Sequence, residues 1–307
     1  MKNPAEARLR AIVLGSAAGG GVPQWNCGCR ICRLAWSGDR RVKPRSQSSV
    51  AVTLDGANWL LLNASIDLRQ QVLATPALHP RGAGRDSPIA AVLLTNGDVD
   101  HIGGLLALRE RQPLTLFGTR GTLETIGANR VFEVLARDVA PRQAVALGER
   151  FEALPGVMVE MFTVPGKTPL WMEEGEVATG IESEATVAVS IEAGARNLLY
   201  APGCARITDA LRERMGKAHV LFFDGTLYTD DEMIREGLGQ KTGARMGHMA
   251  VSGPDGTLAQ LARYPQVRRI LIHINNTNPI LIDGSPEAIE VAAAGWEIAY
   301  DGMEVIP

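Results

Sequence analysis

The chain has 307 residues, of which 46% are hydrophobic and 21% are charged, and its net charge is −3. This composition is typical of a globular protein with a buried core and excludes a disordered chain. The charges are scattered without a basic stripe, which argues against a nucleic-acid partner. The apolar runs, such as Ile89–Leu94, are too short to span a membrane, and Glu6 interrupts the basic start that a signal peptide would need.

Apolar and alternating runs predict short β-strands along the whole chain. We expect strands at Arg8–Leu14, Ser49–Leu54, Trp59–Asn63, Ile89–Thr95, Pro113–Gly118, Val157–Val164, Thr186–Glu192, Asn197–Ala201, His219–Asp224, Arg269–His273 and Trp296–Tyr300. Periodic apolar positions predict helices at Leu68–Ala74, Ile102–Arg109, Gly121–Ala128, Thr208–Met215, Asp230–Glu236, Gly256–Leu261 and Pro286–Ala293. Because these elements alternate without a linker, the sequence predicts one layered α/β domain over residues 1–307, with residues 80–87 as an exposed insertion.

A glycine-rich segment, Gly15–Gly21, follows the first predicted strand. It matches neither the dinucleotide-binding pattern nor the phosphate-binding loop, and no helix is predicted directly after it. We interpret it as a flexible turn that leads from the first strand to the cysteines.

Three of the four cysteines, Cys27, Cys29 and Cys32, are close neighbours in the sequence. Disulfide geometry disfavours bonds between such near neighbours, whereas three thiolates in a tight loop can converge on one zinc ion. We therefore expect a structural zinc loop at residues 27–32, with reduced thiols that bind nothing as the alternative. Such thiols persist in a reducing compartment, so we expect the protein to be cytoplasmic.

The densest group of polar residues follows a predicted buried strand. Asp98, Asp100 and His101 lie between the strand end at Thr95 and a helix predicted from near Ile102. Side chains at such a strand-to-helix corner point into the crevice where ligands usually bind.

Two further histidines are candidates for the same crevice. His273 ends an apolar strand, and His248 lies in a loop rich in glycine and charge. His79 and His219 are interpreted as surface or packing residues.

The segment Thr95–Gly104 resembles the signature of the metallo-β-lactamase superfamily, H-x-H-x-D-H followed by Gly-Gly. The resemblance runs along the whole chain, through Leu14–Ser16, Arg45–Ser49, Gly247–Met249, His273 and Asp301–Glu304. The cysteine loop beside a degenerate metal motif is similar to the family of this superfamily that belongs to the pathway to pyrroloquinoline quinone (PQQ). The resemblance implies an α/β fold, a four-layer αββα sandwich with two mixed β-sheets.

The chain departs from the hydrolases of that superfamily at the first of their two metal sites. Asn96 and Asp98 stand where the hydrolases have histidines, and no histidine occurs in Val164–Lys167, where the third is expected. Cys204 stands in the place of the bridging aspartate. A hydrolase with two metals needs both of them, so the loss argues against hydrolysis.

The second metal site keeps Asp100, His101 and His273. Two imidazoles and one carboxylate on one face of a metal leave the opposite positions open, as in non-haem Fe(II) oxygenases. We therefore expect Fe(II) and O2 at this site. The resemblance implies the same chemistry, namely hydroxylation of the tyrosine ring in a cross-linked Glu–Tyr precursor of PQQ.

Other residues are expected to assist this reaction. Asp98 could ligate the metal weakly, orient a water or act as acid or base. His248 could transfer a proton or contact the substrate, and Asp224 could hold a ligand histidine. A precursor with several carboxylates also needs cationic donors in the cavity. The candidates for these donors are Lys241, Arg245 and Arg45.

The fourth ligand of the expected zinc lies outside the cysteine loop. Related phosphodiesterases have a histidine three residues after the match to His273, and here that position is Asn276. Cys204 is the better zinc ligand chemically, but its alignment places it nearer the active site. We therefore favour Asn276.

Two other functions remain open from the sequence. The chain could be a transport protein that carries PQQ or its precursor without catalysis, or a phosphodiesterase-like metallohydrolase with an altered site. The intact set of Asp100, His101 and His273 favours the hydroxylase over the carrier, and the missing histidines disfavour the hydrolase. A homodimer is left open.

Overall fold

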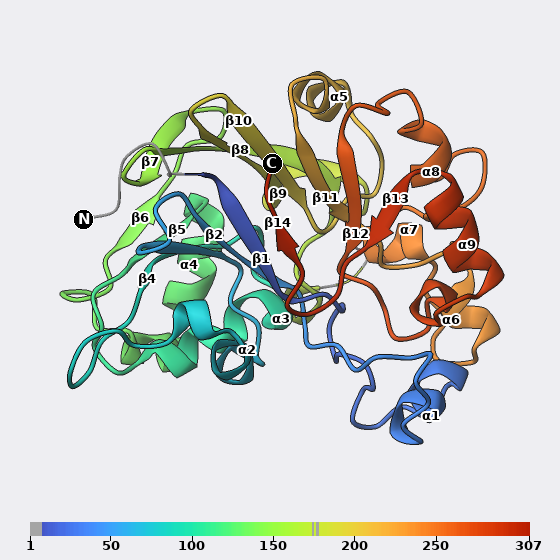
Figure 1. The fold of residues 1–307 in the computed structure, drawn as a ribbon, viewed down its shortest axis with the longest axis horizontal. Helices are drawn as coiled ribbons and strands as arrows, with labels where there is room; N and C mark the ends of the chain where they lie inside the picture. The colour runs from blue at the N-terminus through green and yellow to red at the C-terminus, as the bar shows by residue number, and fades with distance from the viewer. Residues whose placement is uncertain (1–7, 174, 176–177) are drawn as a thin grey trace.

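The computed structural model describes residues 8–173, 175 and 178–307, and its strands form two seven-stranded sheets that pack face to face (Figure 1). The first sheet has the order β14-β1-β2-β3-β4-β5-β6, with β1 at Arg10–Gly15, β2 at Ser49–Thr53, β3 at Trp59–Leu62, β4 at Ile89–Leu93, β5 at Thr115–Gly118, β6 at Arg142–Ala144 and β14 at Glu304–Val305. The second has the order β13-β12-β11-β10-β9-β8-β7, with β7 at Arg150–Leu154, β8 at Val157–Gly166, β9 at Ile181–Ala193, β10 at Arg196–Ala201, β11 at Val220–Asp224, β12 at Arg268–Ile272 and β13 at Trp296–Ile298.

Both sheets are mixed, as predicted. In the first sheet the neighbours from β3 to β6 run parallel and the others antiparallel. In the second sheet the neighbours from β10 to β13 run parallel, while β7 to β10 run antiparallel. Parallel strands end at a common edge of their sheet, so the residues that follow β4, β11 and β12 are brought to sheet edges where ligands usually bind.

Alternation along the strands separates the layers of the core. In β1, Ala11 and Val13 face the second sheet, whereas Ile12 and Leu14 face the helices on the outside. Because both faces are covered, the strands read as continuous apolar runs rather than as alternating polar and apolar residues. This arrangement confirms the predicted αββα layers.

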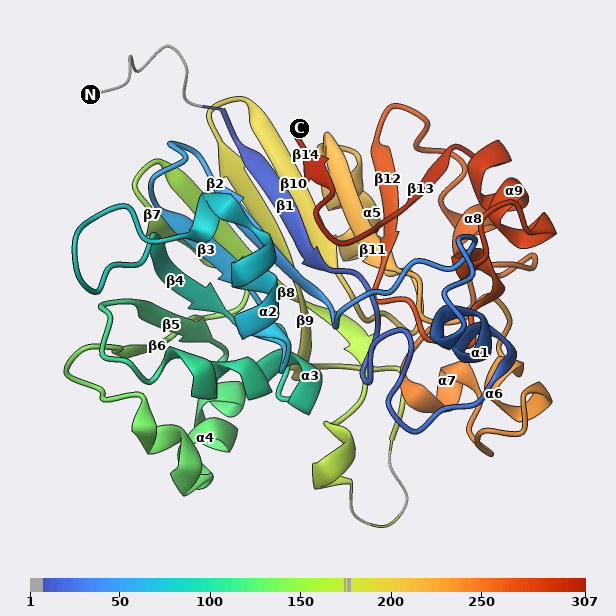
Figure 2. The same ribbon diagram turned by 60° about the horizontal axis from the view of Figure 1, so that its bottom comes forward.

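Short helices cover the outer faces of both sheets (Figure 2). They are α1 at Arg30–Trp36, α2 at Leu68–Ala74, α3 at Val99–Ile102, α4 at Arg120–Ala128, α5 at Asp209–Met215, α6 at Glu232–Arg235, α7 at Gly243–Met246, α8 at Thr257–Gln260 and α9 at Pro286–Ala293. Segments of 3-10 helix lie at Pro76–Leu78, Gly103–Leu108, Arg130–Val134, Leu170–Met172 and Pro279–Leu281. Apolar side chains of α2 and α4 pack on the first sheet, and those of α1, α5, α8 and α9 on the second. Within the residues described, no helix is long and apolar enough to cross a bilayer.

Every predicted strand and helix overlaps an observed element, but several elements were missed. The strands β6, β7 and β14 have two to five residues and at most one buried position each, so they carry no strong apolar pattern. The cysteine segment was predicted as a loop, whereas α1 begins at Arg30 and Cys29 is its N-cap, with the Cys29 Sγ accepting the Cys32 N–H. A thiol is not among the usual N-cap side chains, which hid this helix start.

Candidate metal centre

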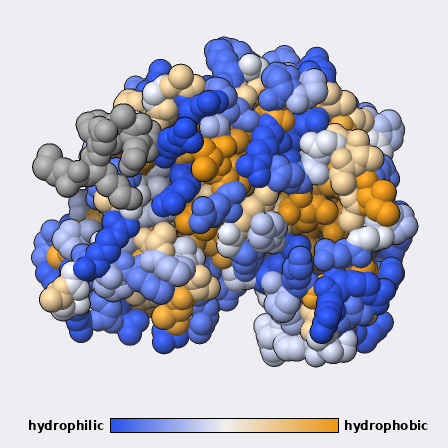
Figure 3. Space-filling model, in the orientation of Figure 1, coloured by the Kyte–Doolittle hydropathy of each residue, from blue (hydrophilic) through white to orange (hydrophobic). Residues whose placement is uncertain are grey.

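A cavity of about 670 Å³ lies where the parallel strands end, with α3 on one side and α6 and α7 on the other. Figure 3 shows the surface hollowed at the lower edge, between the part with α2 and the part with α1. The predicted site residues that line this cavity are Asp98, Asp100, His101, Lys241, His248 and His273.

The three expected iron ligands converge on one point of this cavity. Asp100 and His101 lie in α3, directly after β4, and His273 follows β12. The Asp100 Oδ2 is 3.2 Å from the His273 Nε2 and 3.9 Å from the His101 Nε2. The three donor atoms lie within 4.8 Å of one another, close enough for a single metal ion to bind all of them.

The helix that carries two of these ligands begins earlier than the sequence predicted. It starts at Val99 rather than near Ile102, and a 3-10 helix over Gly103–Leu108 replaces the rest of the predicted helix. The segment is docked on the loop after β3, where the Ala64 N–H donates to the His101 carbonyl at 2.7 Å. A Cβ at Gly104 would lie 2.0 Å from the Ser65 carbonyl oxygen, so only glycine permits this approach.

His101 is buried and has one ring nitrogen without a partner. Its Nδ1 lies 3.4 Å from the Thr95 Oγ1, while its Nε2 is buried and has no hydrogen bond among the residues described. Burial lowers the pKa of His101, which disfavours the charged imidazolium. A buried, unpaired ring nitrogen is costly, and a metal ion at this point would satisfy it.

Asp100 supplies the negative charge of the centre. Burial opposes its ionisation, but the electrostatic interaction with the adjacent His101 and a hydrogen bond with His273 hold the pKa of Asp100 below its usual range. An ionised carboxylate beside two imidazoles is a donor set suited to a divalent cation.

A buried hydrogen-bond network orients His273 and His248. The Thr226 hydroxyl donates to the Asp224 Oδ1 at 2.6 Å and accepts the N–H of the His273 Nδ1 at 2.9 Å. The His248 Nδ1 donates to the Asp224 Oδ2 at 2.7 Å. Both Nδ1 atoms are thus engaged in the network, and the Nε2 of His273 lies 3.2 Å from the Asp100 Oδ2.

Asp224 stands behind the cavity rather than in its lining. It is fully buried at the end of β11 and also accepts the Cys204 N–H at 2.8 Å. Burial opposes its ionisation, but the His248 charge and hydrogen bond lower the pKa of Asp224. Asp224, His248 and His273 form a second group of possible metal donors within 4.8 Å of one another.

Cys204, which stands at the place of the bridging aspartate, is buried in the core. Its Sγ donates to the Arg206 carbonyl at 3.0 Å, and burial raises the pKa of the Cys204 thiol. It belongs neither to the cavity lining nor to the cysteine cluster.

Asp98 lines the cavity but is tied to a neighbouring segment. Its Oδ1 accepts the Leu170 N–H at 3.1 Å, and its own N–H donates to the Asn96 Oδ1 at 3.0 Å. Asn96 and Lys167 also line the cavity. Asn96 stands where a histidine was expected from the resemblance, and Lys167 ends the segment Val164–Lys167 in which another was expected.

The glycine-rich segment is not merely a flexible turn. Ala17 forms β-bridges to Gln47 and Ile274, and Ala18 and Gly19 line the cavity. A Cβ at Gly19 would lie 3.4 Å from the Asp100 Oδ2, so this glycine keeps the space beside the metal ligands open. The sequence interpretation missed this role because the contacts come from residues distant in the chain.

The two predicted arginines lie outside the cavity lining. Arg45 is buried, donates through its Nη1 to the Ala299 carbonyl, and faces the carboxylate of Asp301 rather than the cavity. Its guanidinium therefore contacts the C-terminal segment and lies away from the lining of this cavity. Arg245, in α7, does not line the cavity either. Its Nη1 is buried and has no hydrogen bond among the described residues.

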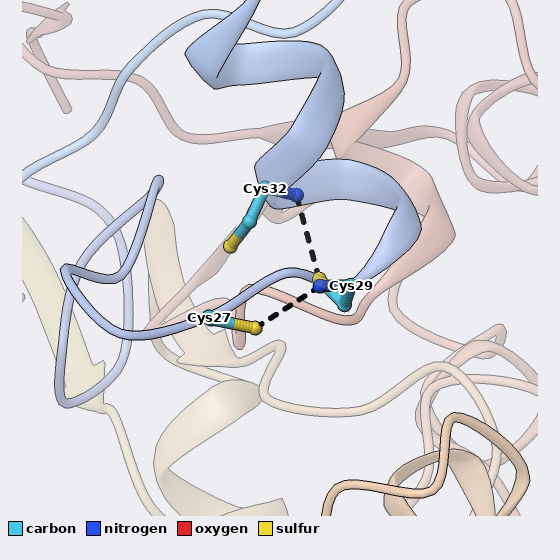
Figure 4. A group of neighbouring side chains, drawn as sticks. All are labelled: Cys27, Cys29 and Cys32. Carbon is cyan, nitrogen blue, oxygen red and sulfur yellow. Dashed lines mark hydrogen bonds between the residues drawn. The ribbon is translucent and has the colours of Figure 1, made fainter.

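The cysteines form a second, separate cluster (Figure 4). The sulfur atoms of Cys27, Cys29 and Cys32 lie within 4.8 Å of one another, and Cys29 and Cys32 are buried. Asn276 adjoins them. Its side-chain Nδ2 is 3.2 Å from the Cys32 Sγ, and its backbone carbonyl oxygen is 3.5 Å from the Cys29 Sγ. Burial and the neighbouring cysteines raise the pKa of Cys29 to about 12, which favours its thiol over its thiolate in the absence of a cation.

The fold and the donor set define a protein of the metallo-β-lactamase superfamily, and residues 58–274 match the family model for the beta-lactamase superfamily domain. Within that superfamily, the chain belongs to the family of coenzyme PQQ synthesis protein B. The protein of that name from Methylobacterium nodulans is 59% identical over 96% of this chain and 99% of its own length. The one from Ruegeria pomeroyi is 51% identical over 97% of this chain and 100% of its own.

Solved structures agree with this assignment. The Zn2+-bound PqqB from Methylobacterium extorquens has a TM-score of 0.95 and 57% identity and covers 96% of this chain and 99% of its own. A diphosphatase from the PhnP family, at 21% identity and a TM-score of 0.66 over 98% of this chain and 97% of its own, shares the fold alone.

Proposed function

We propose that the chain acts in PQQ biosynthesis as an Fe(II)- and O2-dependent hydroxylase of the tyrosine ring in a cross-linked Glu–Tyr precursor. The observation that carries this proposal is the convergence of Asp100, His101 and His273 in one cavity, with the His101 Nε2 buried and unpaired. The relatives described above are named coenzyme PQQ synthesis protein B, which supports a role in PQQ biosynthesis.

The residues present fit Fe(II). Asp100 offers a carboxylate oxygen, and His101 and His273 each offer an Nε2. The Nδ1 of His101 lies beside the Thr95 hydroxyl, and the Nδ1 of His273 is hydrogen-bonded to the Thr226 hydroxyl. Bound there, Fe(II) would supply O2 activation at the positions that the three protein ligands leave open.

His248 is placed to move a proton. It lines the cavity, and its Nδ1 is held by the buried Asp224, so its Nε2 is the atom that can accept a proton from a phenolic hydroxyl. Asp224 acts through His248 by fixing its tautomer and orientation. Leu170, Met233 and Met246 give the cavity apolar surface on which an aromatic ring can pack.

The cavity does not favour the phosphodiesterase alternative. On the side of the lost histidines the cavity is lined by Asn96, Asp98 and Lys167, of which only Asp98 is a good metal ligand. The Lys167 ammonium adds positive charge on the side where a second metal would have to bind. A two-metal mechanism therefore lacks its first site.

We also propose that Zn2+ binds Cys27, Cys29 and Cys32 as a structural ion, with Asn276 as the fourth ligand. The three sulfur atoms are close enough to share one ion, and the Asn276 side chain adjoins Cys32. The ion would tie the start of α1 to the loop after β12, which also carries His273.

A comparison of three histidine variants tests the proposed reaction. His101→Ala should lose Fe(II) binding, measured by anaerobic titration, because it removes a ligand. His248→Gln should keep Fe(II) but lower kcat about 10²–10⁴-fold, because it removes a proton acceptor. His79→Gln, outside the cavity, is the matched control and should behave as wild type.

Two results would contradict the proposal. The first is Fe(II) binding by His101→Ala that equals wild type. The second is tight binding of PQQ by a protein that consumes no O2 in any variant or in wild type, which would favour the carrier alternative.

A further inference from the structure

We propose that Lys167 and Lys241 form a carboxylate-binding subsite in the cavity, and that Glu173 occupies this subsite until a carboxylate of the ligand displaces it. The inference rests on the proposed function only in that the ligand is an aromatic compound with several carboxylates. It adds two residues, Lys167 and Glu173, that the sequence did not indicate.

The geometry of the three side chains is that of a shared ion pair. The Glu173 Oε1 accepts the Lys167 Nζ–H at 2.8 Å, and its Oε2 accepts the Lys241 Nζ–H at 2.9 Å. The Lys167 and Glu173 side chains are only 13% and 12% exposed, whereas Lys241 is 41% exposed. Both lysines line the cavity that contains the metal ligands.

The charges of this group do not balance. Two ammonium groups share one carboxylate, and in the described part of the chain neither lysine pairs with any other acid. A partly buried cation without its full complement of anions attracts another carboxylate, which can use the same donors that Glu173 uses. Although burial opposes it, the two lysine hydrogen bonds lower the pKa of Glu173, so the group that holds the subsite is itself an ionised carboxylate.

The backbone keeps the lysines and the glutamate on separate segments. Lys167 directly follows β8, and a Cβ at Gly247 would lie 3.2 Å from its Cγ, so the lysine stem packs against the residue before His248. Glu173 follows the 3-10 helix Leu170–Met172, which is held on the other side of the cavity.

That 3-10 helix is anchored to the α3 side. The Leu170 N–H donates to the Asp98 Oδ1 at 3.1 Å, and the Trp171 Nε1–H donates to the Gly97 carbonyl at 3.0 Å. Glu173 therefore reaches from an anchored segment to lysines on neighbouring elements, and a change of its side-chain rotamer would free the subsite without moving the metal ligands.

The test compares the affinity of the full-length protein for two probes, PQQ and its trimethyl ester, in Glu173→Gln and wild type. PQQ carries three carboxylates, whereas the ester carries the same rings without these charges. Glu173→Gln should bind PQQ about tenfold more tightly than wild type, since it removes the competing charge, and should bind the ester as wild type does. Lys167→Met should bind PQQ about tenfold more weakly.

A matched pair elsewhere in the chain provides the control. Glu213 and Lys217 form an exposed ion pair at 2.9 Å within and just after α5, so Glu213→Gln removes the same charge far from the cavity and should change neither affinity. An unchanged or weaker affinity of Glu173→Gln for PQQ would overturn the proposal. An equal change for PQQ and for the ester would also overturn it, because that pattern reports a structural role of Glu173.

Failure of this proposal is distinguishable from failure of the proposed function. The affinities are measured at equilibrium without turnover, so they do not depend on O2 consumption. Loss of O2 uptake with the expected affinity pattern contradicts only the hydroxylase, and O2 uptake with a flat affinity pattern contradicts only the subsite.

Discussion

Glu232 makes the stability of the fold depend on pH in a direction opposite to that of most carboxylates. It lies at the start of α6, is only 6% exposed, and accepts the Thr277 hydroxyl at 2.5 Å and the Tyr228 N–H at 2.8 Å. Burial raises the pKa of Glu232 from 4.5 to about 7, against the effect of these hydrogen bonds. Its neighbour Met233 lines the cavity, so the site and this carboxyl share one helix.

The raised pKa has a calculable effect on the free energy of unfolding. Between about pH 4.5 and pH 7 the folded chain holds a proton on Glu232 that the unfolded chain has lost. The free energy of unfolding therefore falls as the pH rises through this window. At about 1.4 kcal/mol per pH unit, the loss between pH 5 and pH 8 is about 2.5 kcal/mol.

Glu232→Gln tests this reasoning because the amide is uncharged throughout the range. Urea unfolding at pH 5 and pH 8 should show the variant gaining about 2.5 kcal/mol relative to wild type as the pH rises. Glu149→Gln, at an exposed turn before β7, is the matched control and should run parallel to wild type. Parallel profiles for Glu232→Gln and wild type would refute the reasoning.

Three further predictions concern the metal sites. Cys29→Ser should release zinc, measured by metal analysis, and lower the free energy of unfolding by about 2–5 kcal/mol, measured by urea unfolding. A fully stable variant would contradict the zinc assignment. Asp224→Asn removes the buried carboxylate that accepts the His248 Nδ1–H. It should therefore change the His248 tautomer, measured by ¹⁵N NMR, and lower kcat. An unchanged spectrum would contradict the role of Asp224. Gly104→Ala should lower the free energy of unfolding by about 3 kcal/mol or more and weaken Fe(II) binding, since its Cβ would lie 2.0 Å from the Ser65 carbonyl oxygen. Wild-type stability of this variant would contradict the close approach.

Much of the fold followed from the sequence because both sheets are covered on both faces. Strands such as β4 and β12 are apolar runs that lead toward Thr95 and His273, and this pattern is strong in a single sequence. The elements that were missed are short or lie at sheet edges, where little apolar surface is buried. The four-residue helix α3 has no period to detect, so Asp100 and His101 were expected in a loop.

The residues of the candidate site also fall into those that the sequence indicates and those that only the fold brings together. His101 and His273 stand out because histidines are rare in the chain and these two follow buried strands. Lys167 and Glu173 carry no local signal, and only the folded chain brings them to Lys241. The position of Arg45 also carries no local signal, because its neighbours Ala299 and Asp301 lie at the far end of the sequence.

The most direct test of the hydroxylase is O2 uptake by anaerobically purified, Fe(II)-loaded protein given the cross-linked Glu–Tyr precursor. With ¹⁸O2, the product should gain labelled oxygen on the tyrosine ring in step with the O2 consumed, and the protein without Fe(II) should show neither. Absence of uptake by the Fe(II)-loaded protein, together with an unchanged precursor mass, would contradict the hydroxylase.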